Sequence, residues 1–499
     1  MKRFDLVSLE TYYPLPEGAS QYPIEFIESQ GAIKLLEDES RVEVGLSEKV
    51  DSAIIVTLRK YHKLPVTFYR INAVELSAYL GKKMGETTDT EQSLKAAEGD
   101  DRVLLDKLAN DAPIVNLVNS ICIEGIRSGA SDIHIEAGPS STRVRYRLDG
   151  VLRTIRTIEG SRFAAVSSRI KIMANLNILE RRQPQDGRIT VSVGNENVDL
   201  RVSIVPIARG ESIVLRILGK NAAPLSLEQL GFAGEQLIVL RRLLRIPHGL
   251  VLVTGPTGSG KTTTLNAMIR EIVSDSIKVI TIEDPVEFLV EGVNQIQINE
   301  QINLGFDVIL RRVLRQDPNV IMVGEIRDGA TAEIAVRAAL TGHLVLSTLH
   351  TNDAVSVIPR LVNMGVEPYL IASVLRGAIA QRLVRKLCPL CASPRPLKPR
   401  EKRILSGCSV TAKTVHDSKG CEECGTSGFK GRTVISEIFS TDSGLEELIL
   451  KGERMGVLND YLMKAGMTTM ARDGARKVAD AVTTLAEVER EIVFPLGDE

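Results

Sequence analysis

The sequence predicts an α/β fold: a mostly parallel sheet flanked by helices, with smaller units before and after it in the chain. From about residue 225 onward, the apolar strand-like runs LVLVTG, KVITIE, VIMVGE and HLVLSTLH alternate with helical stretches, as expected for such a sheet. A glycine-rich loop, GPTGSGKTTT, joins the first of these runs to a helical stretch. A polar tract, GKKMGETTDTEQSLKAAEGDD, separates a small N-terminal segment from the remainder.

Length and composition indicate several folded domains and no broad basic surface. At 499 residues the chain exceeds one ordinary core, and about 100–200 residues per domain suggests three or so. Sixty-two basic and 63 acidic residues give a net charge of −1, so nucleic acid is not an expected partner. The N-terminus lacks an apolar signal-like stretch, and no apolar run is long enough to span a bilayer. We therefore expect a cytoplasmic protein that reaches a membrane only through a partner.

These observations divide the chain into six predicted segments. They are an N-terminal domain (1–95), a linker (96–110), an α+β sheet domain (111–222), a P-loop core (223–384), a tetracysteine module (385–435) and a helical C-terminal region (436–499).

The sheet domain is predicted to open with a helix. In DAPIVNLVNSICIEGIRSGA, Asp111 can cap the first turn and Pro113 suits that turn. Apolar residues recur at helical spacing and form one buried face, which includes Cys122. Cys122 and the isolated Cys408 are both interpreted as ordinary structural cysteines.

An antiparallel hairpin is predicted in TRVRYRLDGVLRTI, where apolar residues alternate with arginines and Asp149-Gly150 forms the turn. The face that carries Arg143, Arg145 and Arg147 could bind phosphate. A solvated sheet face is the preferred interpretation.

The glycine-rich loop matches the P-loop motif and lies between a strand and a helix, the setting that this motif requires. In such a loop the backbone N–H groups surround the phosphates, Lys261 reaches the β- and γ-oxygens, and the Thr262 hydroxyl ligates Mg²⁺. The residues expected to hold ATP are Gly255, Pro256, Thr257, Gly258, Ser259, Gly260, Lys261, Thr262 and Thr263.

Hydrolysis also needs an acidic group that holds metal or orients water, and two strand ends supply candidates. Glu325 ends VIMVGE, the position of a Walker-B-type acid, and Glu283, Asp284 and Glu287 follow another strand. We favour functional roles for Glu283 and Glu325 and leave open which is the base. For Glu287, helix capping and a solvated acidic loop remain open as interpretations.

Two histidines, His343 and His350, stand at either end of the apolar run in TGHLVLSTLH. A strand tip near the P-loop could bring an imidazole to the γ-phosphate. A packing or hydrogen-bonding role is equally compatible with this position.

Two C-x-x-C pairs, 29 residues apart, predict a metal site. Four thiolates suit a closed, tetrahedral, structural Zn²⁺ site without a catalytic role. A redox function is disfavoured because neither pair opens a thioredoxin-like unit. The expected zinc ligands are Cys388, Cys391, Cys421 and Cys424.

In their order along the chain, several stretches resemble one family closely. These stretches are SGASDIHIE, RYRLDGVL, RIKIMANLNILERRQPQDGRI, GPTGSGKTTT, TIEDPVEF, LRQDPNVIMVGEIRD and TGHLVLSTLHTNDA, followed by the four cysteines. Together they resemble the traffic ATPases of secretion and pilus machines, and within these the type II secretion ATPases of the general secretion pathway E family. The likeness runs from about residue 105 to the C-terminus.

This resemblance implies a RecA-like P-loop ATPase domain, preceded by the smaller sheet domain and assembled as a ring of six subunits. It implies catalytic roles for the strand-end residues Glu283, Glu325, His343 and His350. It also implies that two arginines of the sheet domain, Arg201 and Arg216, face the nucleotide.

The resulting hypothesis is a hexameric, Mg²⁺-dependent ATPase at the cytoplasmic face of the inner membrane that drives pseudopilus assembly and protein export by type II secretion. Its N-terminal domain is expected to dock onto inner-membrane platform and linker proteins. A type IV pilus assembly ATPase is the alternative. A nucleic-acid motor is disfavoured by the balanced charge and 4% aromatic content. A scaffold that stays nearly inert until its partners close the ring is a third hypothesis.

Overall fold

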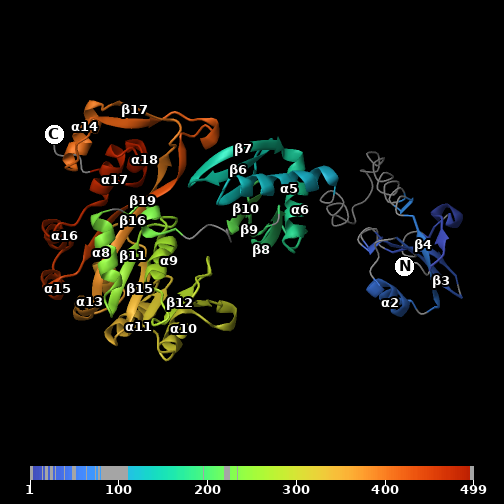
Figure 1. The fold of residues 1–499 in the computed structure, drawn as a ribbon, viewed down its shortest axis with the longest axis horizontal. Helices are drawn as coiled ribbons and strands as arrows, with labels where there is room; N and C mark the ends of the chain where they lie inside the picture. The colour runs from blue at the N-terminus through green and yellow to red at the C-terminus, as the bar shows by residue number, and fades with distance from the viewer. Residues whose placement is uncertain are drawn as a thin grey trace. The chain divides into compact units, whose positions relative to one another are not determined.

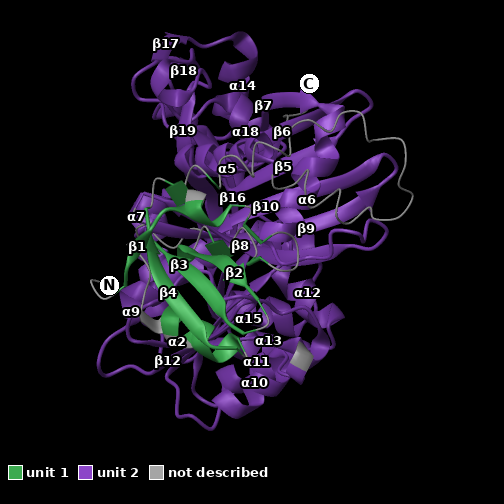
Figure 2. Ribbon diagram, turned by 90° about the vertical axis from the view of Figure 1, so that its right-hand side faces the viewer, with its two compact units in different colours: residues 1–101 green, residues 102–499 purple. Residues whose placement is uncertain are grey.

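The computed structural model describes residues 111–494 apart from 195, 219–224 and 233, and most residues between 4 and 79. The chain divides into two compact units, residues 1–101 and 102–499 (Figures 1 and 2). The predicted linker, residues 96–110, lies outside the described residues, so its character stays a prediction.

The N-terminal unit contains a small mixed sheet with its own apolar core. Its described strands lie in the order β1-β4-β3-β2, in which β1 and β3 are parallel to β4 and β2 is antiparallel to β3. Ile33, Val44 and Ile71 are fully buried between these strands and their neighbours. The elements are β1 (Leu6–Val7), η1 (Leu9–Tyr12), β2 (Ala32–Glu37), β3 (Val42–Leu46), α2 (Ser52–Tyr61) and β4 (Val66–Ile71).

The second unit begins with a six-stranded antiparallel sheet in the order β7-β6-β5-β10-β9-β8. Two helices, α5 and α6, share one apolar core with it. The elements are α5 (Ala112–Arg127), β5 (Asp132–Ala137), β6 (Ser141–Leu148), β7 (Val151–Glu159), η3 (Gly160–Arg162), α6 (Phe163–Met173), β8 (Gln185–Val193), β9 (Glu196–Ile207) and β10 (Gly210–Leu218).

The predicted helix and hairpin are both present in this sheet domain. Helix α5 starts directly after Asp111, although the Asp111 side chain makes no capping hydrogen bond. Cys122 is fully buried on the apolar face of α5, where burial raises the pKa of its thiol to about 12. Asp149 and Gly150 have φ values of 47° and 85° and connect β6 to β7, the turn geometry that an Asp-Gly pair favours.

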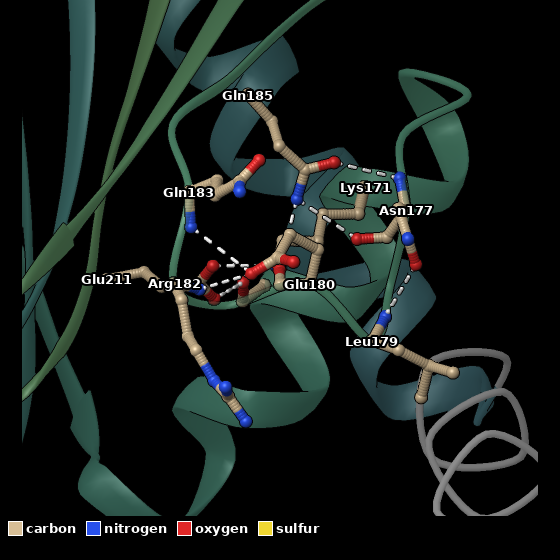
Figure 3. Close-up of polar contacts among 9 residues, drawn as sticks. Lys171, Asn177, Leu179, Glu180, Arg182, Gln183, Gln185 and Glu211 are labelled. Atoms are coloured by element: carbon tan, nitrogen blue, oxygen red, sulfur yellow. Dashed lines mark hydrogen bonds and ion pairs between the residues drawn. The ribbon is translucent and has the colours of Figure 1, made fainter.

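A polar cluster that includes a buried ion pair fixes the loop that leads into β8 (Figure 3). Lys171 of α6 donates hydrogen bonds of 2.6 Å to the Glu211 carboxylate and of 2.6 Å to the Glu180 carbonyl. The Gln185 side chain donates to the carbonyls of Asn177 and Glu180 and accepts from the Asn177 N–H. The start of β8 is thereby tied to α6 and to β10.

Because Lys171 and Glu211 are 1% and 4% exposed, breaking this ion pair leaves an unpaired buried charge. We expect Glu211→Leu to lower the free energy of unfolding by about 3–5 kcal/mol. The double variant Lys171→Met/Glu211→Leu should recover most of that loss, because neither charge remains. Urea unfolding of both variants measures the difference. Equal stability of the single and double variants would contradict this account.

A seven-stranded sheet follows in the second unit, in the order β13-β12-β14-β15-β11-β16-β19. Figure 1 labels β11, β12, β15, β16 and β19 of this sheet. All neighbouring strands are parallel except β16 and β19, which confirms the predicted mostly parallel sheet. Residues of α8 and α9 pack in one apolar core with alternate β11 residues, and residues of α10 to α13 pack in another with the remaining β11 residues. Helices therefore cover both faces.

Helices and strands alternate along this region of the chain. The elements are α7 (Leu227–Leu230), α8 (Glu235–Leu244), β11 (Gly249–Thr254), α9 (Lys261–Ile272), β12 (Val279–Glu283), β13 (Val293–Gln297), η4 (Glu300–Ile302), α10 (Phe306–Val313), β14 (Val320–Val323), α11 (Gly329–Leu340), β15 (Leu344–Leu349), α12 (Val357–Asn363), α13 (Pro368–Val374), β16 (Leu375–Leu387) and β19 (Phe429–Ser440).

The segment between β16 and β19 carries the cysteines, and the predicted boundaries at residues 384 and 435 fall inside these two strands. Four C-terminal helices follow β19, and their apolar residues join the core of the large sheet. The described helices include none with the length and apolar character needed to cross a membrane. The remaining elements are β17 (Ala392–Pro396), α14 (Pro399–Gly407), β18 (Thr414–Ser418), η5 (Glu422–Cys424), α15 (Ser443–Leu450), α16 (Met455–Lys464), α17 (Met470–Ala479) and α18 (Leu485–Glu491).

Candidate active site

The P-loop lies between the end of β11 at Thr254 and the start of α9 at Lys261. Its three glycines, Gly255, Gly258 and Gly260, have φ values of 148°, 82° and 85°, which side chains other than glycine rarely adopt. The exposed segment from Pro256 to Gly258 forms the outer part of the loop. This backbone fits a triphosphate, because it presents N–H groups at a helix N-terminus without intervening side chains.

Lys261 lies folded over the loop that it follows. Its Nζ donates hydrogen bonds to the carbonyls of Gly255 (2.9 Å) and Pro256 (3.2 Å). The pKa of Lys261 is lowered overall, chiefly by burial. The positive charge of Arg382 also lowers this pKa, and the negative charge of Glu325 partly opposes the shift. The half-buried Thr262 stands beside Lys261 in the first turn of α9, where a hydroxyl could serve as a Mg²⁺ ligand.

Glu283 ends β12 and is 2% exposed. Its Oε1 accepts hydrogen bonds from Thr281 Oγ1 (2.7 Å) and Gln295 Nε2 (2.9 Å). Its Oε2 is buried and has no hydrogen-bond partner within the described part of the chain. A buried carboxylate oxygen that lacks a partner is costly, so this oxygen is suited to bind a water molecule or a ligand group. Glu287, four residues later, is exposed.

Glu325 stands two residues beyond β14 and forms an ion pair with Arg327. His350, directly after β15, places its Nε2 3.4 Å from Glu325 Oε2. Burial raises the pKa of Glu325, but the hydrogen bonds and charges of Arg327 and His350 outweigh this and lower it overall. The negative charge of Glu325 also raises the pKa of Lys261, so Glu325 interacts electrostatically with the P-loop lysine.

The lowered pKa of Glu325 predicts a pH-dependent contribution to stability. The ion pair stabilises the fold above the unfolded-state pKa of about 4.3, and this stabilisation is lost as the pH falls through the lowered folded-state pKa. We expect Arg327→Ala to reduce the free energy of unfolding by up to about 1 kcal/mol at neutral pH, with the difference vanishing in acid. Urea unfolding across a pH series tests this, with Arg337→Ala, which removes the exposed Arg337–Glu333 pair, as control. A difference that is independent of pH would contradict it.

His343 lies at the other end of β15 from His350. Its Nδ1 is 2.9 Å from the Ala338 carbonyl and 3.2 Å from Thr341 Oγ1, at the end of α11. Since β15 is parallel to β11 and six residues long, about 20 Å of strand separates His343 from the P-loop edge. The structure thus brings His350, and not His343, to the candidate site of the same chain.

The predicted arginines of the sheet domain lie opposite each other, Arg201 on β9 and Arg216 on β10. A third arginine, Arg188 on β8, lies opposite Arg201 and extends the row. Arg216 bonds to Asp132 at 3.0 Å, and Arg188 bonds to Asp199 at 2.6 Å. No ion pair involves Arg201 among the residues that the structure describes. Arg188 was not among the residues predicted from the sequence, although its place in the stretch QDGR, one strand before Arg201, was a signal for it.

On strand β6, which β5 separates from β10, two arginines interact with carboxylates. Arg145 forms an ion pair with Glu136 at 2.6 Å, and Arg147 lies 3.5 Å from Asp132. Arg143 is exposed. Arg147 and Arg216 share Asp132 and so lie on one face of the sheet, and the preference for a solvated surface over a phosphate-binding one stays a prediction.

The four predicted cysteine ligands converge in space, with their Sγ atoms within 4.8 Å of one another. The closest pairs, Cys421–Cys424 and Cys388–Cys421, are 3.7 and 3.8 Å apart. Although desolvation opposes it, the N–H groups of Cys421 and Gly428 lower the pKa of the Cys424 thiol to about 6. Four converging sulfur donors, one of them already favoured as a thiolate, fit a tetrahedral metal ion. Cys408 lies apart from them, in the apolar core.

Known proteins are similar to this chain over most of its length. The family described as Type II/IV secretion system protein matches residues 107–490. Type II secretion system protein E of Dickeya dadantii is 40% identical over 490 residues, which cover 95% of this chain and 97% of that protein. Type II secretion system ATPase E of Vibrio cholerae is 45% identical over 381 residues, or 76% of each chain. The type IV pilus assembly ATPase PilB of Myxococcus xanthus is 45% identical over 386 residues, covering 77% of this chain and 68% of that protein.

Among solved structures, the pilus retraction motor PilT with bound ADP is similar over 76% of this chain and 97% of that chain. The TM-score is 0.53 and the sequence identity is 28%. The predicted fold class is confirmed: a RecA-like P-loop ATPase domain preceded by a small sheet domain, with an N-terminal domain and a tetracysteine cluster.

Proposed function

This chain belongs to the Type II/IV secretion system protein family, and we propose that it is an ATPase that drives protein export by a type II secretion system. In this proposal, ATP hydrolysis at the cytoplasmic face of the inner membrane powers the assembly of a pseudopilus. The protein acts as a hexamer that is held peripherally at the membrane.

One observation carries the choice of secretion over pilus assembly. The similarity to the Dickeya secretion protein extends over 95% of this chain and therefore includes most of the N-terminal unit. The similarity to the pilus assembly ATPase leaves about a third of that protein unmatched. Assembly of a type IV pilus is the second candidate, because PilB is 45% identical over its matched residues, the same identity as the Vibrio secretion ATPase.

The proposed division of roles follows the geometry of the P-loop and the two strand ends. Residues Gly255 to Thr263 bind the phosphates, and Lys261 turns from the loop carbonyls to the β- and γ-oxygens when ATP binds. Thr262 would hold Mg²⁺, which supplies charge neutralisation at the phosphates. Glu283 offers its unpartnered oxygen to the attacking water or would help to hold Mg²⁺, and Glu325, held by Arg327 and His350, stays ionised at neutral pH.

The arginine row supplies the link between hydrolysis and movement in this proposal. Arg201 and Arg216, together with Arg188, present positive charge from the sheet domain. Guanidinium groups can neutralise the γ-phosphate only when that domain closes on a nucleotide, so hydrolysis and domain movement are coupled. His343, at the far end of β15, takes no part in the chemistry of its own subunit in this scheme.

The tetracysteine cluster would hold a structural Zn²⁺ through Cys388, Cys391, Cys421 and Cys424. The metal supplies cross-linking of the segment between β16 and β19, and no catalytic step is assigned to it. The N-terminal domain docks onto the platform and linker proteins of the inner membrane, and nucleic acid is not a partner.

Cross-linking of the full chain in source-cell membranes, followed by mass spectrometry of the captured proteins, tests the proposed system. Capture of inner-membrane proteins of a type II secretion system supports the proposal, and the yield should fall when residues 1–95 are deleted. Capture of a pilus platform protein in their place would assign the chain to fibre assembly and overturn the choice of system.

A further inference from the structure

Strand β16 runs beside the P-loop and places two consecutive polar side chains, Gln381 and Arg382, in the interior of the protein. In the parallel pair of β11 and β16, Ala380 lies opposite Thr254, so Gln381 stands beside the first residue of the loop. Gln381 is 0% exposed and Arg382 is 7% exposed. Such burial costs free energy unless specific hydrogen bonds compensate it.

Gln381 contacts the P-loop at both of its ends. Its side-chain Nε2 donates a hydrogen bond of 2.7 Å to the Ser259 carbonyl. Its own carbonyl oxygen stands so close to Gly255 that a Cβ at that position would lie 2.6 Å from it. Strand β16 therefore packs closely against the start of the loop at Gly255 and is hydrogen-bonded to the loop at Ser259.

The bond to Ser259 has a consequence for the next peptide N–H. A trans peptide is planar, and its C=O and N–H point in opposite directions. Gln381 holds the Ser259 carbonyl toward β16, so the N–H of Gly260 is directed away from β16. Gly260 is the last loop residue before α9, where N–H groups are suited to bind a phosphate oxygen.

Arg382 fixes Gln381 in turn. Its guanidinium donates to the Gln381 carbonyl at 3.1 Å and to the Asn352 carbonyl at 3.0 Å. In the described residues it forms no ion pair, and its positive charge acts on the pKa of Lys261. The dipeptide thus connects the loop with the segment that follows His350.

We propose that Gln381 is a positioning residue for the nucleotide: it orients the Ser259–Gly260 peptide so that the Gly260 N–H is available to a phosphate group. The inference rests on the proposed function, in that the loop must bind ATP. Gln381 belongs neither to the P-loop nor to the pair of strand-end acids, Glu283 and Glu325.

The test compares nucleotide affinity in full-length Gln381→Met with that of the unaltered chain. Methionine keeps the length of glutamine and lacks the N–H donor. We expect the Kd values for ATP and ADP to rise about tenfold, as for the loss of one well-placed hydrogen bond. The Tm without nucleotide should change little, and the Tm increase on adding ADP should be smaller. Ile379→Met, at a fully buried position two residues earlier on β16, is the matched control and should bind normally.

Gln381→Asn supplies a second variant, because it keeps the amide but is too short to reach Ser259. It should weaken binding like the methionine variant. Unchanged Kd values in a folded Gln381 variant would overturn the inference, as would a lowered Tm with unchanged affinity, which indicates a purely structural role. If the unaltered chain itself fails to bind ATP, the proposed function fails, and this outcome is distinct from a failure of the inference alone.

Discussion

Replacing Lys261 with alanine is expected to abolish ATP hydrolysis and protein export together. The Nζ group lies at the loop carbonyls and within electrostatic reach of Glu325, so no other described lysine can supply the same charge at the phosphates. Loss of a single preorganised charge at a phosphoryl transfer site lowers kcat by about 100-fold or more. Phosphate release by the purified protein and export in a complemented deletion strain measure the two effects.

The matched control is Lys451→Ala. Lys451 is exposed and pairs with Glu447 at the end of α15, a solvent-exposed ion pair that contributes little to stability. It should leave hydrolysis and export unchanged. Normal export by a Lys261→Ala chain that is stably expressed would refute the assignment of this P-loop as the motor of export.

Removal of the proposed Zn²⁺ is expected to unfold the segment between β16 and β19 while the nucleotide site stays folded. The sulfur atoms belong to two C-x-x-C pairs that are distant in the sequence. Between these pairs, β17 and β18 form only a two-stranded sheet, which is marginally stable without a cross-link. Structural zinc sites contribute about 10–16 kcal/mol of apparent binding free energy in small peptides. Cys424→Ser should therefore reduce bound zinc from about one ion per chain to near zero and expose the amides of β17 and β18 to hydrogen exchange.

Elemental analysis and hydrogen exchange of the same preparations check both parts of this prediction. Cys408→Ala provides the control, because Cys408 is buried within the same segment but lies outside the cluster. It should keep its zinc and its exchange protection. A metal-free protein in which β17 and β18 remain fully protected would show that sulfur convergence serves another purpose.

The parts of the site that depend on local chemistry were predictable from the sequence. The P-loop is one such part, because its glycines, Lys261 and Thr262 are consecutive and the flanking strand and helix are strongly patterned. Convergence of the four cysteines was predictable for a similar reason, because thiolate pairs at this spacing have few other uses in a reducing compartment. The Asp149-Gly150 turn was also predictable, because this residue pair by itself favours a hairpin turn.

Features that depend on strand register were not predictable in this way. The hydrogen bond between Gln381 and Ser259 joins residues 122 apart, and the run around Gln381 reads mainly as an apolar strand. Arg188 joins Arg201 only through the pairing of β8 with β9. Conversely, strand polarity separates His343 from His350, which the sequence alone placed on equal terms.

Strand β16 also has a mechanical consequence. It is hydrogen-bonded to β11 from Leu375 to Ala380 and to β19 from Gly377 to Leu387, and it ends one residue before Cys388, the first of the four clustered cysteines. About 23 Å of extended backbone separates Gln381 at the P-loop from Cys388. Over this stretch the strand is paired with β19, with a register shift between Arg385 and Leu387. Any displacement of the cysteine cluster therefore reaches the P-loop along a single strand that β19 supports.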